Sequence, residues 1–205
     1  MALCVLCVSA AAQEERNELT GTIGRMFISD QGLQGPSAPA VNPFIHSGHG
    51  LTFEVSYARR LFGKDIYALF GEIPAAFNFK EKLNSGGNVV PTQYSQVFVT
   101  PALRLNLFPA TAVSPWASIG GGFAHFSESD QLIYGGTNPG GSTTSGVLEA
   151  GAGLDINPFE HRLKNLGFRL AFRDFWSGEP DFPLADTGKT RQHNYYVGGG
   201  VVWHF

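Results

Sequence analysis

Hydrophobic and polar residues alternate with a period of two along most of the chain after residue 13. Leu51, Phe53, Val55 and Tyr57 share one parity, for example, and the residues between them are polar or small. Successive side chains of a β-strand point to opposite faces, so this pattern predicts strands with one apolar and one polar face. We expect eight strands, each close to the ~9–11 residues that a tilted strand needs to cross a bilayer. They run over Glu18–Ile28, Gly50–Arg60, Asp65–Phe77, Tyr94–Leu107, Pro115–Phe126, Ser145–Asn157, Leu166–Trp176 and His193–Phe205.

Three positions interrupt the alternation. Arg25 has the parity of the apolar Ile23, so either its side chain snorkels towards an interface or Gly24 marks a β-bulge. Pro74 and Pro101 fall inside expected strands, where proline has no N–H to give to the ladder. We therefore expect a bulge or a shortened strand at each proline.

The connections between these strands alternate in length. The short ones cover residues 61–64, 108–114 and 158–165, and the long ones cover 31–49, 78–93, 127–144 and 177–192. Short turns at one end and long loops at the other are typical of bacterial outer-membrane barrels. The pattern thus predicts an all-β, up-and-down antiparallel barrel with short periplasmic turns and long extracellular loops.

The composition fits such a barrel. Charged residues make up 15% of the chain, below the ~25% of soluble domains, and it has 26 glycines and 17 phenylalanines. No apolar run reaches the ~18 residues of a membrane helix, so a membrane-spanning form has to be a closed barrel. The net charge of -3 gives no basic surface, and we expect no nucleic-acid partner.

The first twelve residues have features of a secretory signal peptide. Residues 2–8 form a short apolar core, and Ala10 and Ala12 fit an Ala-x-Ala site, so we expect cleavage after Ala12 and a mature barrel domain over 13–205. A basic stretch is missing, so either the true start lies further upstream or the signal segment is truncated; a buried N-terminal strand is the alternative. Cys4 and Cys7 both lie in this segment, which leaves the mature chain without a thiol for a disulfide or metal site.

The last strand carries the most specific pattern. Counting back by twos from Phe205 gives an apolar face with aromatic residues at both ends, formed by Tyr195, Val197, Val201, Trp203 and Phe205. This strand resembles the assembly signal of outer-membrane β-barrel families, in which a terminal Phe is read by the barrel-assembly machinery. The whole expected mature chain resembles the small eight-stranded superfamily of OmpA and OmpX barrels.

The resemblance implies a location in the outer membrane of a Gram-negative bacterium. It implies as partners the lipid bilayer, lipopolysaccharide and, during biogenesis, the assembly machinery, and it implies a monomer. It brings no cofactor, no metal and no particular activity.

Charged residues recur in the middle of the expected strands. A lipocalin barrel would have its apolar face inside, but these charges, the unequal loops and the terminal strand favour a polar lumen. An eight-stranded barrel encloses a lumen that side chains can fill, and buried charges need partners. We therefore expect a plugged lumen with a network of ion pairs among Glu54, Glu72, Arg104, Glu149, Arg169 and Arg173.

The best candidate for catalysis is the pair His125 and Ser127, which share a strand face. A histidine beside a serine hydroxyl can act as its general base. The His-x-Ser spacing is similar to that of outer-membrane lipid A deacylases, but this chain has Glu128 where that family has Asn. An interfacial histidine and a loop serine are the plainer interpretation.

Three functional hypotheses follow. The leading one is a non-enzymatic barrel that acts structurally or through its extracellular loops. The alternatives are a lipid A-modifying hydrolase that uses His125 and Ser127, and a narrow channel for ions or small solutes. Residues 173–176 and 178–182 are candidates for an ordered rim or a recognition surface, and a structured loop base is the plainer interpretation of both segments.

Overall fold

The computed structural model describes residues 16–35, 38–39, 41–158, 165–188 and 190–205. The expected signal peptide, residues 1–12 with Cys4 and Cys7, lies outside these ranges. No helix in them is long and apolar enough to cross a membrane. The strands are β1 (Asn17–Ile28), β2 (Gln31–Gly32), β3 (Phe44–Ser47), β4 (Leu51–Gly63), β5 (Tyr67–Ser85), β6 (Gln93–Val99), β7 (Ala102–Leu107), β8 (Val113–Glu128), β9 (Ser142–Ile156), β10 (Leu166–Gly178) and β11 (Arg191–His204).

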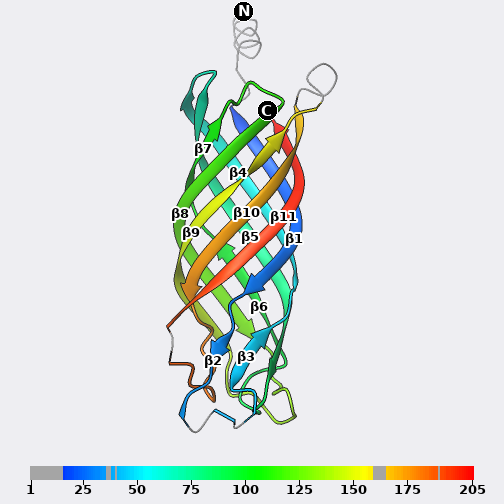
Figure 1. Ribbon diagram of the computed structural model, residues 1–205, viewed down its shortest axis with the longest axis vertical. Helices are drawn as coiled ribbons and strands as arrows, with labels where there is room; N and C mark the ends of the chain where they lie inside the picture. The colour runs from blue at the N-terminus through cyan, green and yellow to red at the C-terminus, as the bar shows by residue number, and fades with distance from the viewer. Residues whose placement is uncertain (1–15, 36–37, 40, 159–164, 189) are drawn as a thin grey trace, which may run out of the picture.

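The strands form an antiparallel barrel with eight strand positions, and β6 and β7 together fill one of them (Figure 1). Each position pairs with the next along the chain, as β1 does with β4 and β9 with β10. The ring is completed where β1 pairs with β11 from Glu18–His204 to Ile28–Asn194. Asn17 and Phe205 extend this seam through two backbone hydrogen bonds of 3.0 and 2.9 Å. The predicted fold class, an eight-stranded up-and-down barrel, is confirmed.

Several strands run further than the sequence pattern indicated. β5 continues to Ser85, so the first half of the long connection expected over 78–93 is strand. The first connection, expected over 31–49, contains the short strands β2 and β3, and β3 pairs with the end of β5. The barrel wall therefore extends beyond the predicted strands at the end with the long connections, which is the lower end in Figure 1.

The irregular positions have three different outcomes. The strand expected over Tyr94–Leu107 is interrupted at Pro101, between β6 and β7. Pro74 stays in register with Ser56 of β4, but the ladder from β5 to β6 and β7 skips it, and its carbonyl accepts from Thr100 N–H at 3.2 Å. Arg25 is exposed on the outer face, where its guanidinium donates to the carbonyl of His49 at 3.3 Å. The register passes Gly24 without a bulge, so the bulge alternative is wrong.

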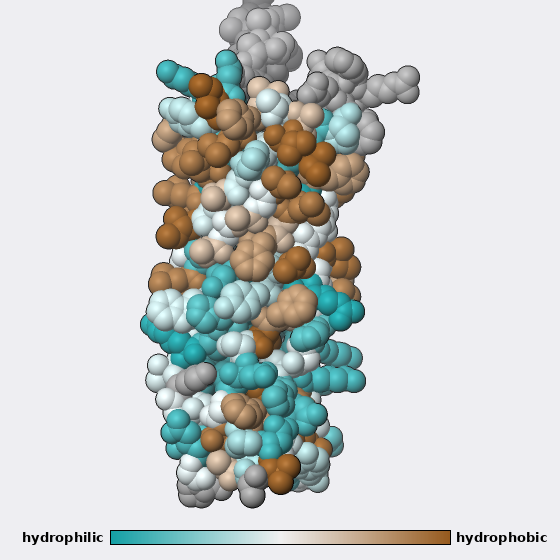
Figure 2. Space-filling view, in the orientation of Figure 1, coloured by the Kyte–Doolittle hydropathy of each residue, from teal (hydrophilic) through white to brown (hydrophobic). Residues whose placement is uncertain are grey.

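The outer face of the barrel carries an apolar band. Leu103 and Ile119, for example, are 52% and 70% exposed. Figure 2 shows apolar residues gathered on the upper part of the barrel and polar ones on the lower part, beyond the band. On β5 the band ends after Phe79, where Lys80 and Lys82 are exposed, and on β8 it ends after Phe123.

The interior is divided into two layers. The part nearer the short turns holds buried charges, called here the charged layer: Glu18, Glu54, Glu72, Arg104, Glu149, Asp155, Arg169 and Arg173. The part nearer the long connections holds buried rings, called here the aromatic layer: Tyr94, Phe98, Phe126, Phe175 and Phe182. A barrel this narrow is filled by side chains, and here the filling changes character along its axis.

Candidate functional site

Arg173 lies at the centre of the charged layer. Its Nε is 2.9 Å from Glu54 Oε2, its Nη2 2.8 Å from Glu72 Oε1 and its Nη1 2.7 Å from Glu149 Oε1. These carboxylates come from β4, β5 and β9, so one guanidinium on β10 links three other strands across the lumen. The planar fork of arginine suits this arrangement because its donors point in several directions in one plane.

Arg169 and Arg104 continue the network towards the short turns. Arg169 donates to both oxygens of Asp155, at 2.6 and 2.8 Å. Arg104 pairs with Glu18, and both arginines also lie 3.5 Å from Glu72. All six residues expected in the lumen are therefore brought together. Glu18 and Asp155 were not included in the expected network, although Asp155 has the parity of Glu149 on the same expected strand; both lie near strand ends, and the expectation was limited to mid-strand charges.

Trp116 lies beside the charged layer. Its ring is 5.4 Å from the guanidinium carbon of Arg169 and 5.2 Å from that of Arg173, which are cation–π distances. The indole crosses the backbone of Gly153, where a Cβ would be 2.5 Å from the ring. Glycine is required here because any side chain would displace the tryptophan from between the two cations.

The charged layer is fully enclosed. Arg104, Arg169 and Arg173 have no exposed surface, and five carboxylates surround these three guanidiniums. His204 adds a ring nitrogen 3.6 Å from Glu18. A single layer of this kind binds the strands to one another and fills the lumen with side chains.

The aromatic layer fills the lumen between the charged layer and the long connections. Phe98 and Phe175 stack at 4.7 Å with 19° between their planes, and Phe126 meets Phe98 edge-on at 89°. Tyr94 meets Phe182 at 76°, and Phe182 comes from the connection between β10 and β11. This connection therefore folds back into the mouth of the barrel and is held by a ring.

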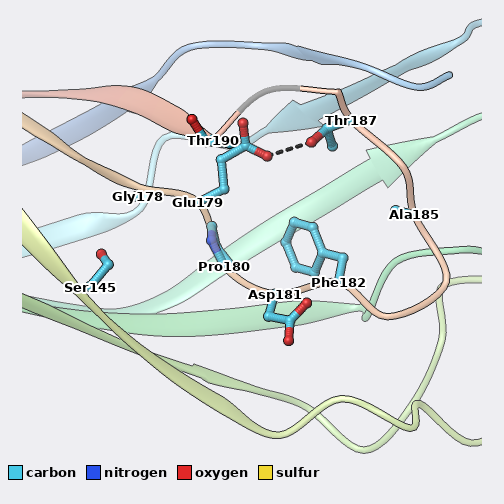
Figure 3. Close-up of a pocket in the computed structure, with 9 residues that line it drawn as sticks. All are labelled: Ser145, Gly178, Glu179, Pro180, Asp181, Phe182, Ala185, Thr187 and Thr190. Carbon is cyan, nitrogen blue, oxygen red and sulfur yellow. Dashed lines mark hydrogen bonds between the residues drawn. The ribbon is translucent and has the colours of Figure 1, made fainter.

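The same connection borders a pocket of about 370 Å³ at the rim (Figure 3). Its lining includes Ser145 of β9 and residues from Gly178 to Thr190. Thr187 donates a hydrogen bond to the Glu179 carboxylate, which joins two separate parts of the connection. Residues 178–182 are therefore part of a loop base that is held by its own hydrogen bond and borders the pocket.

Two carboxyls beyond the apolar band are held away from water. Glu81 Oε2 accepts hydrogen bonds from Gly50 N–H at 3.0 Å and from Asn78 at 2.8 Å, yet burial raises the pKa of Glu81. Burial likewise raises the pKa of Glu128, whose carboxylate accepts from Asn138 at 2.8 Å. Both groups belong to the wall that extends past the band.

The candidate catalytic pair lies on the outer face of β8. His125 alternates with the buried Ala124 and Phe126, and Ser127 is exposed two residues further on. The hydrogen bond that the structure gives His125 joins its Nδ1 to Thr144 Oγ1 at 2.8 Å. The pair thus faces outward just beyond the apolar band, with a hydroxyl where a catalytic triad has a carboxylate.

The residues of the expected assembly signal all face outward; four lie on β11, and Phe205 directly follows its last residue. Their exposed fractions run from 36% to 50%, and the inward positions between them include the buried Tyr196 and Val202. Trp203 and Phe205 contact each other at 5.0 Å at the end with the short turns. An apolar, aromatic outer strand is therefore present at the seam.

No protein-family model matches the sequence, and a search of curated proteins found no relative. Several solved structures, in contrast, have a fold similar to that of this chain. Neisserial surface protein A has a TM-score of 0.57 at 12% identity, over 92% of this chain and 97% of that protein. Outer membrane protein OprG from Pseudomonas aeruginosa has a TM-score of 0.55 at 14% identity, over 94% of this chain and 98% of OprG. The chain therefore has the fold of the small eight-stranded outer-membrane β-barrel proteins.

Proposed function

We propose that this chain is an integral outer-membrane protein without enzymatic activity, whose barrel is closed to solutes and whose role depends on its extracellular rim. The observation that carries this proposal is that two successive layers of side chains fill the lumen. Three fully buried arginines occupy the charged layer, and four phenylalanines and a tyrosine occupy the aromatic layer. The Phe175–Phe98 stack alone spans two strands on different sides of the closed wall.

The outward surface supports the membrane location. Alternation places apolar side chains outside and charges inside, which is the arrangement of membrane barrels and the reverse of lipocalins. A signal peptide at 1–12, a bilayer with lipopolysaccharide as surroundings, assembly by the barrel-assembly machinery and a monomeric state belong to this proposal.

Two measurements test the proposal. The purified protein should partition into detergent micelles or vesicles as a folded barrel, and it should give no conductance steps in planar bilayers. A Phe182→Ala variant should also be silent, because the charged layer still closes the lumen. Spontaneous steady conductance of the unmodified protein would favour the narrow channel instead.

The hydrolase alternative is tested separately. Lipid A from cells that contain the protein should be unchanged relative to cells with Ser127→Ala. Loss of an acyl chain that depends on both Ser127 and His125 would establish the hydrolase and refute the proposal.

A further inference from the structure

The outer wall carries a groove beside an ion pair. The ion pair occupies outward positions where the alternation pattern would place apolar side chains. On β10 the outward residues are Phe168, Leu170 and Phe172, and the next outward position is Asp174. Asp174 Oδ2 lies 2.8 Å from Nδ1 of His193, on the neighbouring β11. Ionisable groups are unfavourable on a lipid-facing surface and mark functional sites when they occur there.

The groove itself measures about 250 Å³ and crosses four strands, from β8 through β9 and β10 to His193 of β11. The ladder aligns Ile119 of β8, Ala150 of β9 and Asp174 of β10 in one row. Ile119 is 70% exposed, so the small Ala150 forms a floor between a large aliphatic side chain and the ion pair. Leu148 and Trp176 line the next row, towards the rim.

Planar side chains continue from the groove across β10 and β11. The Trp176 and His193 rings stack at 6.2 Å with 17° between their planes, and His193 and Tyr195 stack at 5.6 Å with 7°. The guanidinium of Arg191 lies 4.7 Å from the Trp176 ring. Stacking uses the face of the guanidinium and leaves its N–H donors directed around the edge.

We propose that this groove binds one phosphorylated lipid of the outer leaflet, with an acyl chain along Ile119, Ala150 and Leu148 and its phosphate at Arg191 and His193. The aliphatic floor lies at the level of the apolar band, where hydrocarbon is the surrounding medium. Arg191 supplies a permanent cation at the end of the groove nearest the rim. Cations near the headgroup region of a bilayer attract lipid phosphates.

Asp174 is a positioning residue in this arrangement. Two carboxylate oxygens lie 3.1 and 2.8 Å from Nδ1 of His193, so this nitrogen faces the protein and Nε2 faces away from it. Asp174 thus fixes the orientation of the histidine ring before a ligand binds, as hydrogen-bond partners of ligand-binding histidines do in other proteins. The inference rests on the proposed membrane location, because only a bilayer supplies the lipid.

The test uses the full-length protein in a neutral detergent and native mass spectrometry with added phosphatidylglycerol, diacylglycerol or purified lipid A. The unmodified protein should retain one phosphatidylglycerol or one lipid A and at least tenfold less diacylglycerol, which lacks the phosphate. The ratio of retained phosphatidylglycerol to retained lipid A identifies which class of lipid supplies the phosphate.

Paired variants localise the site. Ala150→Phe fills the floor and should abolish retention, whereas Ala152→Phe makes the same change two residues further along the exposed face of β9 and should not. Arg191→Gln should lower retention about tenfold, in line with a lost charge-assisted contact. Equal retention by the two phenylalanine variants, or equal retention of diacylglycerol, would overturn the inference.

Failure of the proposed function would look different. A protein that does not insert into micelles or vesicles as a folded barrel refutes the membrane location itself. A folded, inserted protein whose lipid retention is the same in all variants refutes only the groove.

Discussion

Replacement of Arg173 by Met should be among the most destabilising single changes in the barrel. The substitution keeps a long side chain but removes the cation that lies 2.7–2.9 Å from Glu54, Glu72 and Glu149. Removing one partner of a buried ion pair costs about 3–5 kcal/mol, because the other charge stays buried without compensation. Glu72 keeps Arg104 and Arg169 at 3.5 Å, whereas Glu54 and Glu149 lose the ion-pair partner that the structure gives each of them.

The charge balance places the expected value in the upper part of that range. The charged layer already contains two more carboxylates than guanidiniums, so loss of Arg173 adds to an existing excess of negative charge. Neutralising the carboxylates in the same background should reverse the effect. The triple variant Arg173→Met, Glu54→Gln, Glu149→Gln should recover roughly half of the lost stability or more, since neutral amides are less unfavourable than unpaired charges.

Urea unfolding in lipid vesicles measures these differences through the midpoint and the slope of the transition. Arg59→Met is the control, since Arg59 is exposed and its loss should change the free energy of unfolding by at most about 0.5 kcal/mol. If Arg173→Met stays within about 1 kcal/mol of the unmodified barrel, the charged layer does not stabilise the fold as argued.

Three further changes test other parts of the structure. Gly151→Ala should destabilise the barrel by about 1–3 kcal/mol in urea unfolding, because its Cβ would lie 2.4 Å from Ser118 Oγ and 2.7 Å from Glu149 Oε1; Gly146→Ala, on the same strand with open space around it, should be neutral. Burial raises the pKa of Glu81 in the folded state, so the unfolded chain loses this proton first and stability should fall as pH rises above the ordinary carboxyl range. Glu81→Gln should remove this fall in unfolding midpoints compared between about pH 4 and about pH 7, and an unchanged profile would contradict the burial argument. Deletion of Phe205 should lower the assembled fraction in cells while the refolded barrel loses little stability; equal assembly of both chains would exclude an assembly signal at this residue.

The sequence was sufficient for the barrel because the charged residues of the lumen and the apolar residues of the outer face have opposite parity on most strands. It was insufficient where the parity shifts along a strand, or where inward and outward residues are both apolar. On β5 both Phe79 and Lys80 are exposed and the register shifts between Asn78 and Glu81, which hid the last part of the strand. Inward rings such as Phe98 have the parity of the charged residues, but an isolated phenylalanine does not show which face it occupies.

The outer groove could not be found from the sequence for a different reason. Asp174 and His193 are nineteen positions apart and meet only because β10 and β11 pair in one particular register. A shift of a single residue would turn one of them into the lumen. Alternation predicts that strands exist, whereas the site depends on how neighbouring strands are aligned.

The seam between β1 and β11 also sets the order of events during folding. Asn17 and Phe205 are 188 residues apart, so the hydrogen bonds between them can form only after all the intervening strands have taken their places in the wall. Contacts of such long sequence separation form slowly, since the chain loses much conformational freedom before they compensate for it. Until then one edge of β1 is unpaired, and an unpaired strand edge can pair with another chain. A barrel of this design therefore needs its first strand to be protected until the last strand has paired with it.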